Sequence, residues 1–267
     1  MTRGRLRAAA LAAVSLLATG SRANAAMGGG PPARTEPFSL RGVSQTLHLY
    51  GAPRGKVAIV TSGDGGWVHL GPDVAAFLAG EGYRVVGFDA KAYLSSFTSR
   101  SGPLHVEDVP RDYGALLDYA AQGAPGRPLL VGVSEGAGLS VLAATAPEVQ
   151  SRVAGVVALG LPDLNELGWR WRDSIIYITK KTPNEPLFSA REVAARVSPV
   201  PLAAIHSTHD EFVALPEIRG ILAQAREPKQ LWVIEAADHR FSDNQPELQR
   251  RLKEAIAWIE SQRTPVP

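Results

Sequence analysis

The chain contains no cysteine among its 267 residues. Disulfide bonds, thiol nucleophiles and cysteine-ligated metal sites are therefore excluded. Apolar runs long enough for a membrane span are also lacking, because the stretch over residues 8–18 is too short to cross a bilayer comfortably. Basic blocks with interleaved aromatic residues are missing, so we expect no nucleic-acid partner. No histidine and carboxylate spacing suggests a metal site, and we expect no cofactor.

The N-terminal segment has the pattern of a secretory signal peptide. Arg3, Arg5 and Arg7 precede the apolar stretch, and Ala23-Asn24-Ala25 follows it with the small residues of a cleavage site. We therefore expect residues 1–25 to be a signal peptide and the protein to be periplasmic, with an uncleaved anchor as the alternative. The lack of cysteine near this site excludes a lipoprotein, and it suits folding in an oxidising compartment.

The remaining chain suits one globular domain, since 45% of the residues are hydrophobic and the net charge is only +2. Residues 26–37 are rich in Gly and Pro, which predicts a flexible linker before a domain over 38–264. Strands are expected at 57–60, 85–88, 129–133, 153–159, 202–205 and 231–234, and helices at 73–80, 109–121, 137–145, 215–225 and 246–259. This alternation predicts an α/β protein, with a mostly parallel central sheet and helices on both faces.

One segment, 161–198, interrupts this alternation between two late strands. It is too long for a simple crossover and is interpreted as a lid or cap insertion. Trp169 and Trp171 alternate here with arginines, a mixture found where proteins touch membrane surfaces. The alternative is a lid that packs its aromatic side chains onto the core.

The most informative motif is Gly132-Val133-Ser134-Glu135-Gly136, between an apolar run and a helical stretch. A serine between two glycines at a strand-to-helix turn is typical of a nucleophile elbow. The glycines permit the sharp turn, and the helix N-terminus directs positive potential at the serine. An ordinary strand-to-helix turn could have the same local sequence. The residues at the other strand ends must therefore show whether Ser134 belongs to a catalytic site.

A glycine-rich loop follows the first expected strand of the domain. In a hydrolase it would supply an oxyanion-hole N–H from Asp64 or Gly65, and the residue after the nucleophile, Glu135, would supply the second. A phosphate-binding turn is the alternative. It is disfavoured because no Gly-Lys-Ser/Thr sequence follows.

The two late strands end near an acid and a histidine. Asp210 follows the strand at 202–205 and is our candidate for the carboxylate of a triad, with Glu211 and Asp163 as alternatives. His239 follows the last strand, where it could reach the serine oxygen as a general base. The order Ser134, Asp210, His239 is the chain order of α/β-hydrolases. The other histidines are poorer candidates by position: His48, His69, His105, His206 and His209.

The segments 60–67 and 82–89, with Tyr93 and the serine elbow, resemble the bacterial virulence-protein family typified by VirJ and AcvB. The sequence Ser62-Gly63-Asp64-Gly65-Gly66-Trp67 is its most specific part. The resemblance implies an exported α/β-hydrolase that cleaves lysyl-phosphatidylglycerol. Glu135 stands where the family more often has Phe or Gln.

Such an aminoacyl-lipid substrate carries a cationic amine, so its pocket should contain acidic side chains. We expect pocket residues among Asp163, Glu166, Trp67, Trp169 and Trp171, with Asp64 and Glu135 adding to the local acidic excess. Two other functions stay open: a general periplasmic carboxylesterase, and a non-catalytic secretion accessory protein on the same scaffold.

Overall fold

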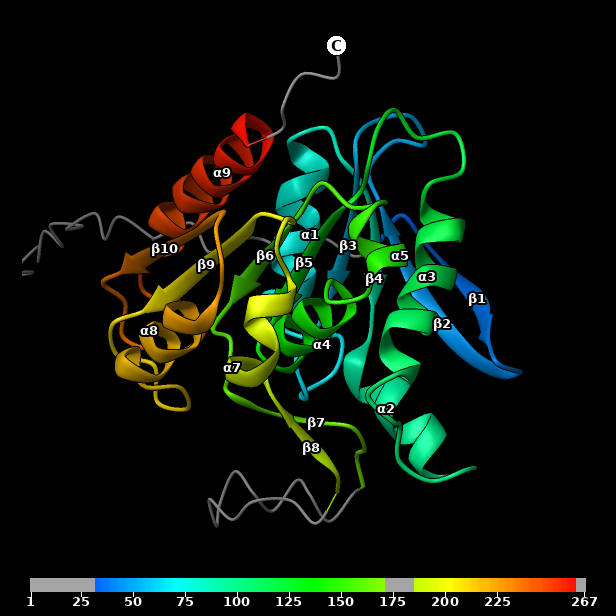
Figure 1. Ribbon diagram of the computed structural model, residues 1–267. Helices are drawn as coiled ribbons and strands as arrows, with labels where there is room; N and C mark the ends of the chain where they lie inside the picture. The colour runs from blue at the N-terminus through cyan, green and yellow to red at the C-terminus, as the bar shows by residue number, and fades with distance from the viewer. Residues whose placement is uncertain (1–31, 171–184, 263–267) are drawn as a thin grey trace, which may run out of the picture.

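The computed structural model describes residues 32–170 and 185–262. Its centre is an eight-stranded sheet with the strand order β1-β2-β4-β3-β5-β6-β9-β10 (Figure 1). The strands are β1 (Arg34–Leu40), β2 (Val43–Tyr50), β3 (Val57–Thr61), β4 (Arg84–Phe88), β5 (Leu129–Val133), β6 (Gly155–Leu159), β9 (Leu202–Ser207) and β10 (Lys229–Ile234). The pairs β1–β2 and β2–β4 are antiparallel, and the six strands from β4 to β10 in this order are parallel.

Helices cover both faces of the sheet. On one face lie α1 (Leu70–Gly80) and α9 (Gln245–Ser261), which share a core with alternate residues of the strands. On the other lie α2 (Ala90–Thr98), α3 (Asp108–Ala120), α4 (Glu135–Ala143), α5 (Pro147–Gln150), α7 (Ala190–Val193) and α8 (Leu215–Gln224). The central strands β3, β5 and β6 are buried at every residue, as expected for strands covered on both sides.

The described ends of segment 161–198 form a small antiparallel pair, β7 (Leu164–Glu166) and β8 (Leu187–Ser189). A short helix, α7, and a 3₁₀ turn, η2 (Ala194–Arg196), lead back to the main sheet. The β7–β8 pair projects from the carboxyl-end side of the sheet, below α4 and α7 in Figure 1. Trp171 lies outside the described residues, so a lid function for this segment stays a prediction.

Two expectations need correction. The linker predicted over 26–37 ends earlier, because β1 begins at Arg34. β1 is an edge strand, where a proline such as Pro37 and exposed polar residues are tolerated. Helix α1 begins at Leu70 rather than Asp73, since a proline in the first turn lacks only an N–H that would have no helical partner.

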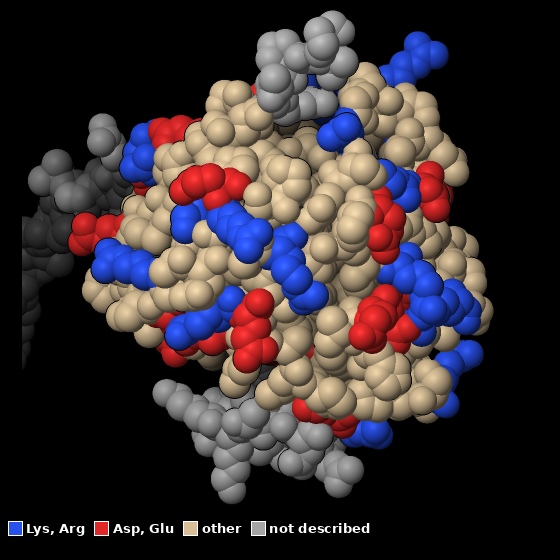
Figure 2. Space-filling model, viewed as in Figure 1, with Lys and Arg blue, Asp and Glu red and all other residues tan. Residues whose placement is uncertain are grey.

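The predicted signal peptide lies outside the described residues and stays a prediction. Within those residues, no helix combines the length and apolarity needed to cross a bilayer. The face seen in Figure 2 carries basic and acidic side chains in alternation, without a large field of one sign.

Candidate active site

Ser134 stands on a sharp turn between β5 and α4. Its backbone has φ 51° and ψ −120°, a conformation that residues other than glycine rarely adopt. The turn requires both flanking glycines: a Cβ on Gly132 would lie 2.2 Å from the carbonyl oxygen of Gly136, and one on Gly136 would lie 2.3 Å from that of Ser62. The strand, the strained serine and the helix thus form a nucleophile elbow.

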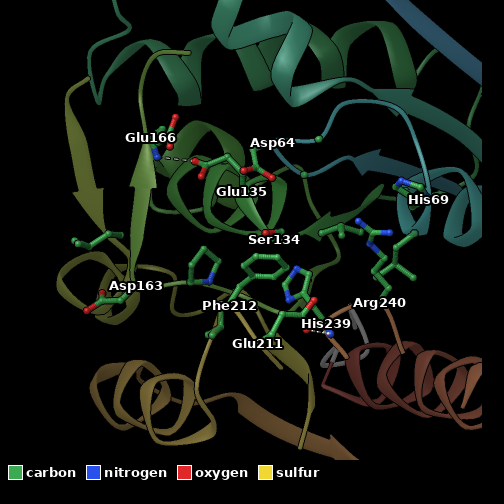
Figure 3. A pocket seen from close by; sticks show the side chains of 18 of the residues that line it. Asp64, His69, Ser134, Glu135, Asp163, Glu166, Glu211, Phe212, His239 and Arg240 are labelled. Carbon is green, nitrogen blue, oxygen red and sulfur yellow. Dashed lines mark hydrogen bonds between the residues drawn. The ribbon is translucent and has the colours of Figure 1, made fainter. Parts of the chain in front are cut away.

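His239 and Asp210 form a buried hydrogen-bonded pair at the ends of the last two strands. His239 Nδ1 donates to Asp210 Oδ2 at 2.6 Å, and the two side chains are 9% and 1% exposed. This bond fixes the tautomer in which Nε2 is free to accept a proton. Within the described residues, this buried Nε2 has no hydrogen-bond partner. His239 lies next to Ser134 in Figure 3, and both line one cavity.

The acid occupies a tight turn after β9. Asp210 Oδ1 accepts the backbone N–H groups of Phe212 at 2.9 Å and Val213 at 2.8 Å. Burial alone would raise the pKa of Asp210, but the hydrogen bonds from His239 and from these backbone groups lower it below its ordinary value. The carboxylate is therefore ionised at neutral pH and able to stabilise a charged imidazole.

Neighbouring groups hold the histidine in place. The carboxylate of Glu211, one alternative for the triad acid, accepts the backbone N–H of His239 at 2.8 Å and does not bond the imidazole. The ring of Phe212 meets the imidazole edge to face, with centroids 5.5 Å apart. A Cβ on Gly160 would lie 2.4 Å from His239 Cε1, so this glycine gives the ring its space.

The predicted oxyanion loop lies beside Ser134. An added Cβ on Gly63 would lie 3.2 Å from the Cβ of Ser134, and Asp64 and Gly65 line the same cavity. The hydroxyl of Ser62 accepts the N–H of Ala90, and the carboxylate of Asp89 accepts that of Trp67, so both ends of the loop are tied to the start of α2. Glu135 begins α4, where backbone N–H groups lack helical acceptors.

These groups open into a cavity of about 1040 Å³ at the carboxyl ends of the parallel strands. Six carboxylate residues line it against two arginines. The acids are Asp64, Glu135, Asp163, Glu166, Glu211 and Glu217, and the arginines are Arg191 and Arg240. The local acidic excess expected from the sequence is therefore present.

Glu135 is the most deeply buried of these acids, at 6% exposure. Its Oε1 accepts the backbone N–H of Glu166 at 2.7 Å, which joins α4 to β7 (Figure 3). Burial, and after it the nearby charges of Glu166 and Asp64, raise the pKa of Glu135 well above its ordinary value. A cation placed among these three carboxyl groups would relieve their mutual repulsion.

Asp163 lines the cavity, but its carboxylate already has hydrogen-bond and ion-pair partners within the protein. Its Oδ1 accepts the Ser189 hydroxyl at 2.7 Å and the backbone N–H of Arg191 at 2.9 Å, and its Oδ2 lies 3.4 Å from the Arg191 guanidinium. These bonds tie the start of the insertion to α7. Asp163 is thus a structural residue of the cavity wall and does not contact the imidazole.

Two aromatic residues predicted for the pocket lie elsewhere. Trp67 stacks on His48, with centroids 4.7 Å apart, and its indole N–H donates to the Tyr50 hydroxyl, so it packs against β2. Trp169 packs partly buried on the core with Lys91 over its ring, 4.4 Å from the centroid. Their apolar surface is used in packing, and neither lines the cavity.

Several lining residues were not singled out from the sequence as site residues. Val68, Leu164 and Phe212 are large apolar side chains that are about half exposed, and all three line the cavity. His69 and Arg240 line it as well. Arg240 directly follows His239 in the sequence, but an isolated arginine, or an apolar residue such as Leu164, carries no local signal of a role in a site.

Comparison with solved structures shows an α/β-hydrolase fold. An α/β hydrolase, GrgF from Penicillium sp. sh18, superposes with a TM-score of 0.64 at 15% identity, over 84% of this chain and 98% of that one. Est1E from Butyrivibrio proteoclasticus gives 0.62 at 13% identity, over 85% and 99%. A membrane phospholipase A described as a bacterial virulence factor gives 0.62 at 11% identity, over 85% and 86%.

Sequence comparison adds two findings. A Gloeobacter violaceus protein described as UPF0284 protein glr4139 is 28% identical over 166 residues. That alignment covers 57% of this chain and 44% of the relative, so this chain spans less than half of the relative's length. The family model described as bacterial virulence protein (VirJ) matches residues 55–168, which include the glycine-rich loop and the serine elbow. The resemblance predicted from the sequence is thereby confirmed: residues 55–168 are similar to the VirJ family, and they lie within a chain that has an α/β-hydrolase fold.

Proposed function

We propose that this chain is an exported serine hydrolase that cleaves the aminoacyl ester of lysyl-phosphatidylglycerol. The observation that carries the proposal is the meeting of Ser134 and the His239–Asp210 pair at one acid-lined cavity. Export rests on the N-terminal sequence alone, and the hydrolase class is supported by the fold.

The geometry suits acyl transfer to Ser134. His239 Nε2 would take the hydroxyl proton as the serine oxygen attacks the ester carbonyl. The negative charge that develops on the carbonyl oxygen would be met by N–H groups of Glu135 and of the loop containing Asp64 and Gly65. The same imidazole would then protonate the leaving alcohol and activate a water molecule for deacylation.

A cationic acyl group is favoured by the acidic wall. Glu135, Glu166 and Asp64 lie together on one side of Ser134 in Figure 3, close to where the acyl part of an ester would rest. An ammonium group there would pair with carboxylates in a partly buried setting, where charge-assisted hydrogen bonds contribute about 1.5–3 kcal/mol.

An amphiphilic substrate is favoured by the apolar rim formed by Val68, Leu164 and Phe212. Apolar side chains exposed together around a cavity mark sites that bind apolar groups. They line the same cavity as the acids here, a combination that suits a lipid with a charged head. A general carboxylesterase would use the same triad without needing the acidic wall.

Peripheral contact with a membrane surface is part of the proposal. It rests on this apolar rim and on the aromatic and basic residues around Trp169. Co-sedimentation of a Trp169→Ala/Trp171→Ala variant with anionic liposomes tests whether the insertion contributes to this membrane contact. We expect the variant to bind the liposomes less than the wild type does. Unchanged binding would show that these two tryptophans of the insertion do not contribute to membrane contact.

The direct experiment is thin-layer analysis of lysyl-phosphatidylglycerol vesicles incubated with the protein. The wild type should convert the lipid to phosphatidylglycerol and free lysine, and Ser134→Ala should not. If the wild type leaves the lipid intact but hydrolyses simple esters, the general carboxylesterase is the better assignment.

The acidic wall has its own test, which compares lysyl esters with neutral acyl esters of the same alcohol. Glu135→Gln and Asp64→Asn should lower the preference for the lysyl ester by about tenfold or more, because each removes a carboxyl group that can ionise and form a charge-assisted contact with the ammonium. A preference that stays unchanged in both variants would contradict a role for these acids in choosing the substrate.

A further inference from the structure

The charges around the nucleophile are unevenly distributed. Figure 3 places Asp64, Glu135 and Glu166 on one side of Ser134, and His69 and Arg240 on the other. The second arginine of the cavity, Arg191, is engaged with Asp163. The second wall also contains Glu211, whose carboxylate accepts the backbone N–H of His239. The first wall is therefore purely acidic and the second carries the cation of Arg240, so an ester held between them would experience different potentials at its two ends.

Arg240 is the cation that remains available on its wall. Within residues 32–170 and 185–262, its guanidinium has no carboxylate within salt-bridge distance, although its charge helps to lower the pKa of nearby Asp238, and it lines the cavity. The nearest acid along the chain is Asp238, which accepts the Ser242 hydroxyl and the backbone N–H groups of Arg240 and Ser242. Asp238 thus shapes the turn that carries Arg240 and does not line the cavity.

His69 gives this wall a second, independent feature. Its backbone has φ 55° and ψ −123°, almost the same rare conformation as that of Ser134. Strain of this kind costs about 1–3 kcal/mol and is found at catalytic residues and ligand clamps. The exposed His69 imidazole lines the cavity beside Arg240 (Figure 3), and the first residues of α1 continue the same wall.

We infer that Arg240, with His69 beside it, forms a subsite for an anionic group on the alcohol part of the ester. This inference rests on the proposed function: if the acidic wall takes the cationic acyl part, the leaving alcohol lies on the opposite side of Ser134. A guanidinium presents paired donors that match the oxygens of a phosphodiester or a carboxylate. The subsite holds the alcohol while His239 protonates its oxygen.

Direct binding tests the subsite without depending on catalysis. Ser134→Ala protein is titrated by calorimetry with glycerophosphoglycerol, with glycerate and with glycerol. These ligands carry a phosphodiester, a carboxylate and no charge, so they distinguish the two sources of the anion. We expect an anionic ligand to bind and glycerol to bind at least tenfold more weakly.

Arg240→Gln, added to Ser134→Ala, should weaken binding of the anionic ligand by about tenfold or more. Arg226→Gln is the matched control, because Arg226 is exposed and does not line the cavity, and it should leave the affinity unchanged. His69→Ala should weaken binding to a smaller extent. Thermal unfolding of each variant checks that the fold is retained.

Two results would overturn the inference. One is equal affinity of the Arg240→Gln protein and its parent for the anionic ligand. The other is a parent protein that binds glycerol as well as it binds either anion. Failure of the proposed function is a separate outcome, because it is measured as the absence of lysine release from lysyl-phosphatidylglycerol by the wild type.

Discussion

Ser134 is held in its strained conformation by a tightly packed turn, in which the two flanking glycine positions leave no room for a side chain. The flanking glycines, the Ser62 carbonyl oxygen behind Gly136 and the helix that begins at Glu135 all restrict the turn. Ser134, Asp210 and His239 each follow a strongly apolar strand, and the structure brings them together as expected, while their catalytic roles stay a prediction. The contributions of Phe212 and Arg240 could not be predicted, because they depend on how loops approach each other in space.

A methyl group at the elbow should be poorly tolerated. Gly136→Ala would place its Cβ 2.3 Å from the Ser62 carbonyl oxygen, so the elbow must shift. We expect a loss of about 1–3 kcal/mol in the free energy of unfolding, together with most of the activity, measured by denaturant unfolding and ester hydrolysis. Gly114→Ala, in helix α3 with open space around it, should instead stabilise the protein by about 0.4–1 kcal/mol.

The choice of acid in the triad can be tested by paired amide variants. Asp210→Asn should reduce kcat by about 10⁴-fold, because the amide cannot hold the required tautomer of His239. Glu211→Gln should have a much smaller effect, since a glutamine oxygen can still accept the His239 backbone N–H. A larger loss in Glu211→Gln than in Asp210→Asn would reverse the assignment.

The buried Glu135 predicts a pH-dependent stability. Burial and the neighbouring acids raise its pKa in the folded state, so the folded protein binds this proton more tightly than the unfolded chain does. Its contribution to stability is fully present below the unfolded pKa and is lost as pH rises through the folded pKa. Glu135→Gln should therefore raise the Tm relative to wild type at pH 8 and have little effect at pH 4. An equal shift at both pH values would contradict the raised pKa.

The strands with continuous apolar runs and the helices with a clear helical period were predicted, whereas β1, β2, α2 and several short elements were missed. Strand β2 has an alternating burial pattern, but one of its buried positions is Gln45, whose amide bonds Ser96 in α2. Helix α2 is short and rich in serine, and its start depends on capping by Asp89. A polar residue buried through a distant partner weakens the local pattern from which an element is recognised.

The β1–β2 hairpin is attached to α3 by an ion pair in which the acid, Asp112, is buried and the partner, Arg41, is partly exposed. Arg41, in the turn, donates to both carboxylate oxygens of Asp112 at 2.9 and 2.7 Å, and Tyr93 donates to the same carboxylate. Arg41→Ala would leave Asp112, 2% exposed, without its cation, so we expect a loss of about 3–5 kcal/mol in denaturant unfolding. The control Arg34→Ala removes an exposed pair with Glu36 and should cost at most about 1 kcal/mol.

The complete fold explains why distant segments of sequence form one site. Parallel strands place their carboxyl ends at one edge of the sheet, so β3, β5, β9 and β10 deliver the oxyanion loop, the serine, the acid and the histidine together. The β7–β8 insertion adds Glu166 and Leu164 as the outer wall. In the proposed function, the strand ends supply the reacting groups, and the insertion and loops determine the substrate preference.

The central claim, that Ser134 is an activated nucleophile, is tested most directly by reaction with a fluorophosphonate probe followed by mass spectrometry of the digested protein. We predict a covalent adduct on the peptide containing Ser134 in the wild type, and its loss in Ser134→Ala and His239→Ala. Wild-type protein that stays unlabelled while a control serine hydrolase reacts fully would contradict the account and favour a binding protein on a hydrolase scaffold.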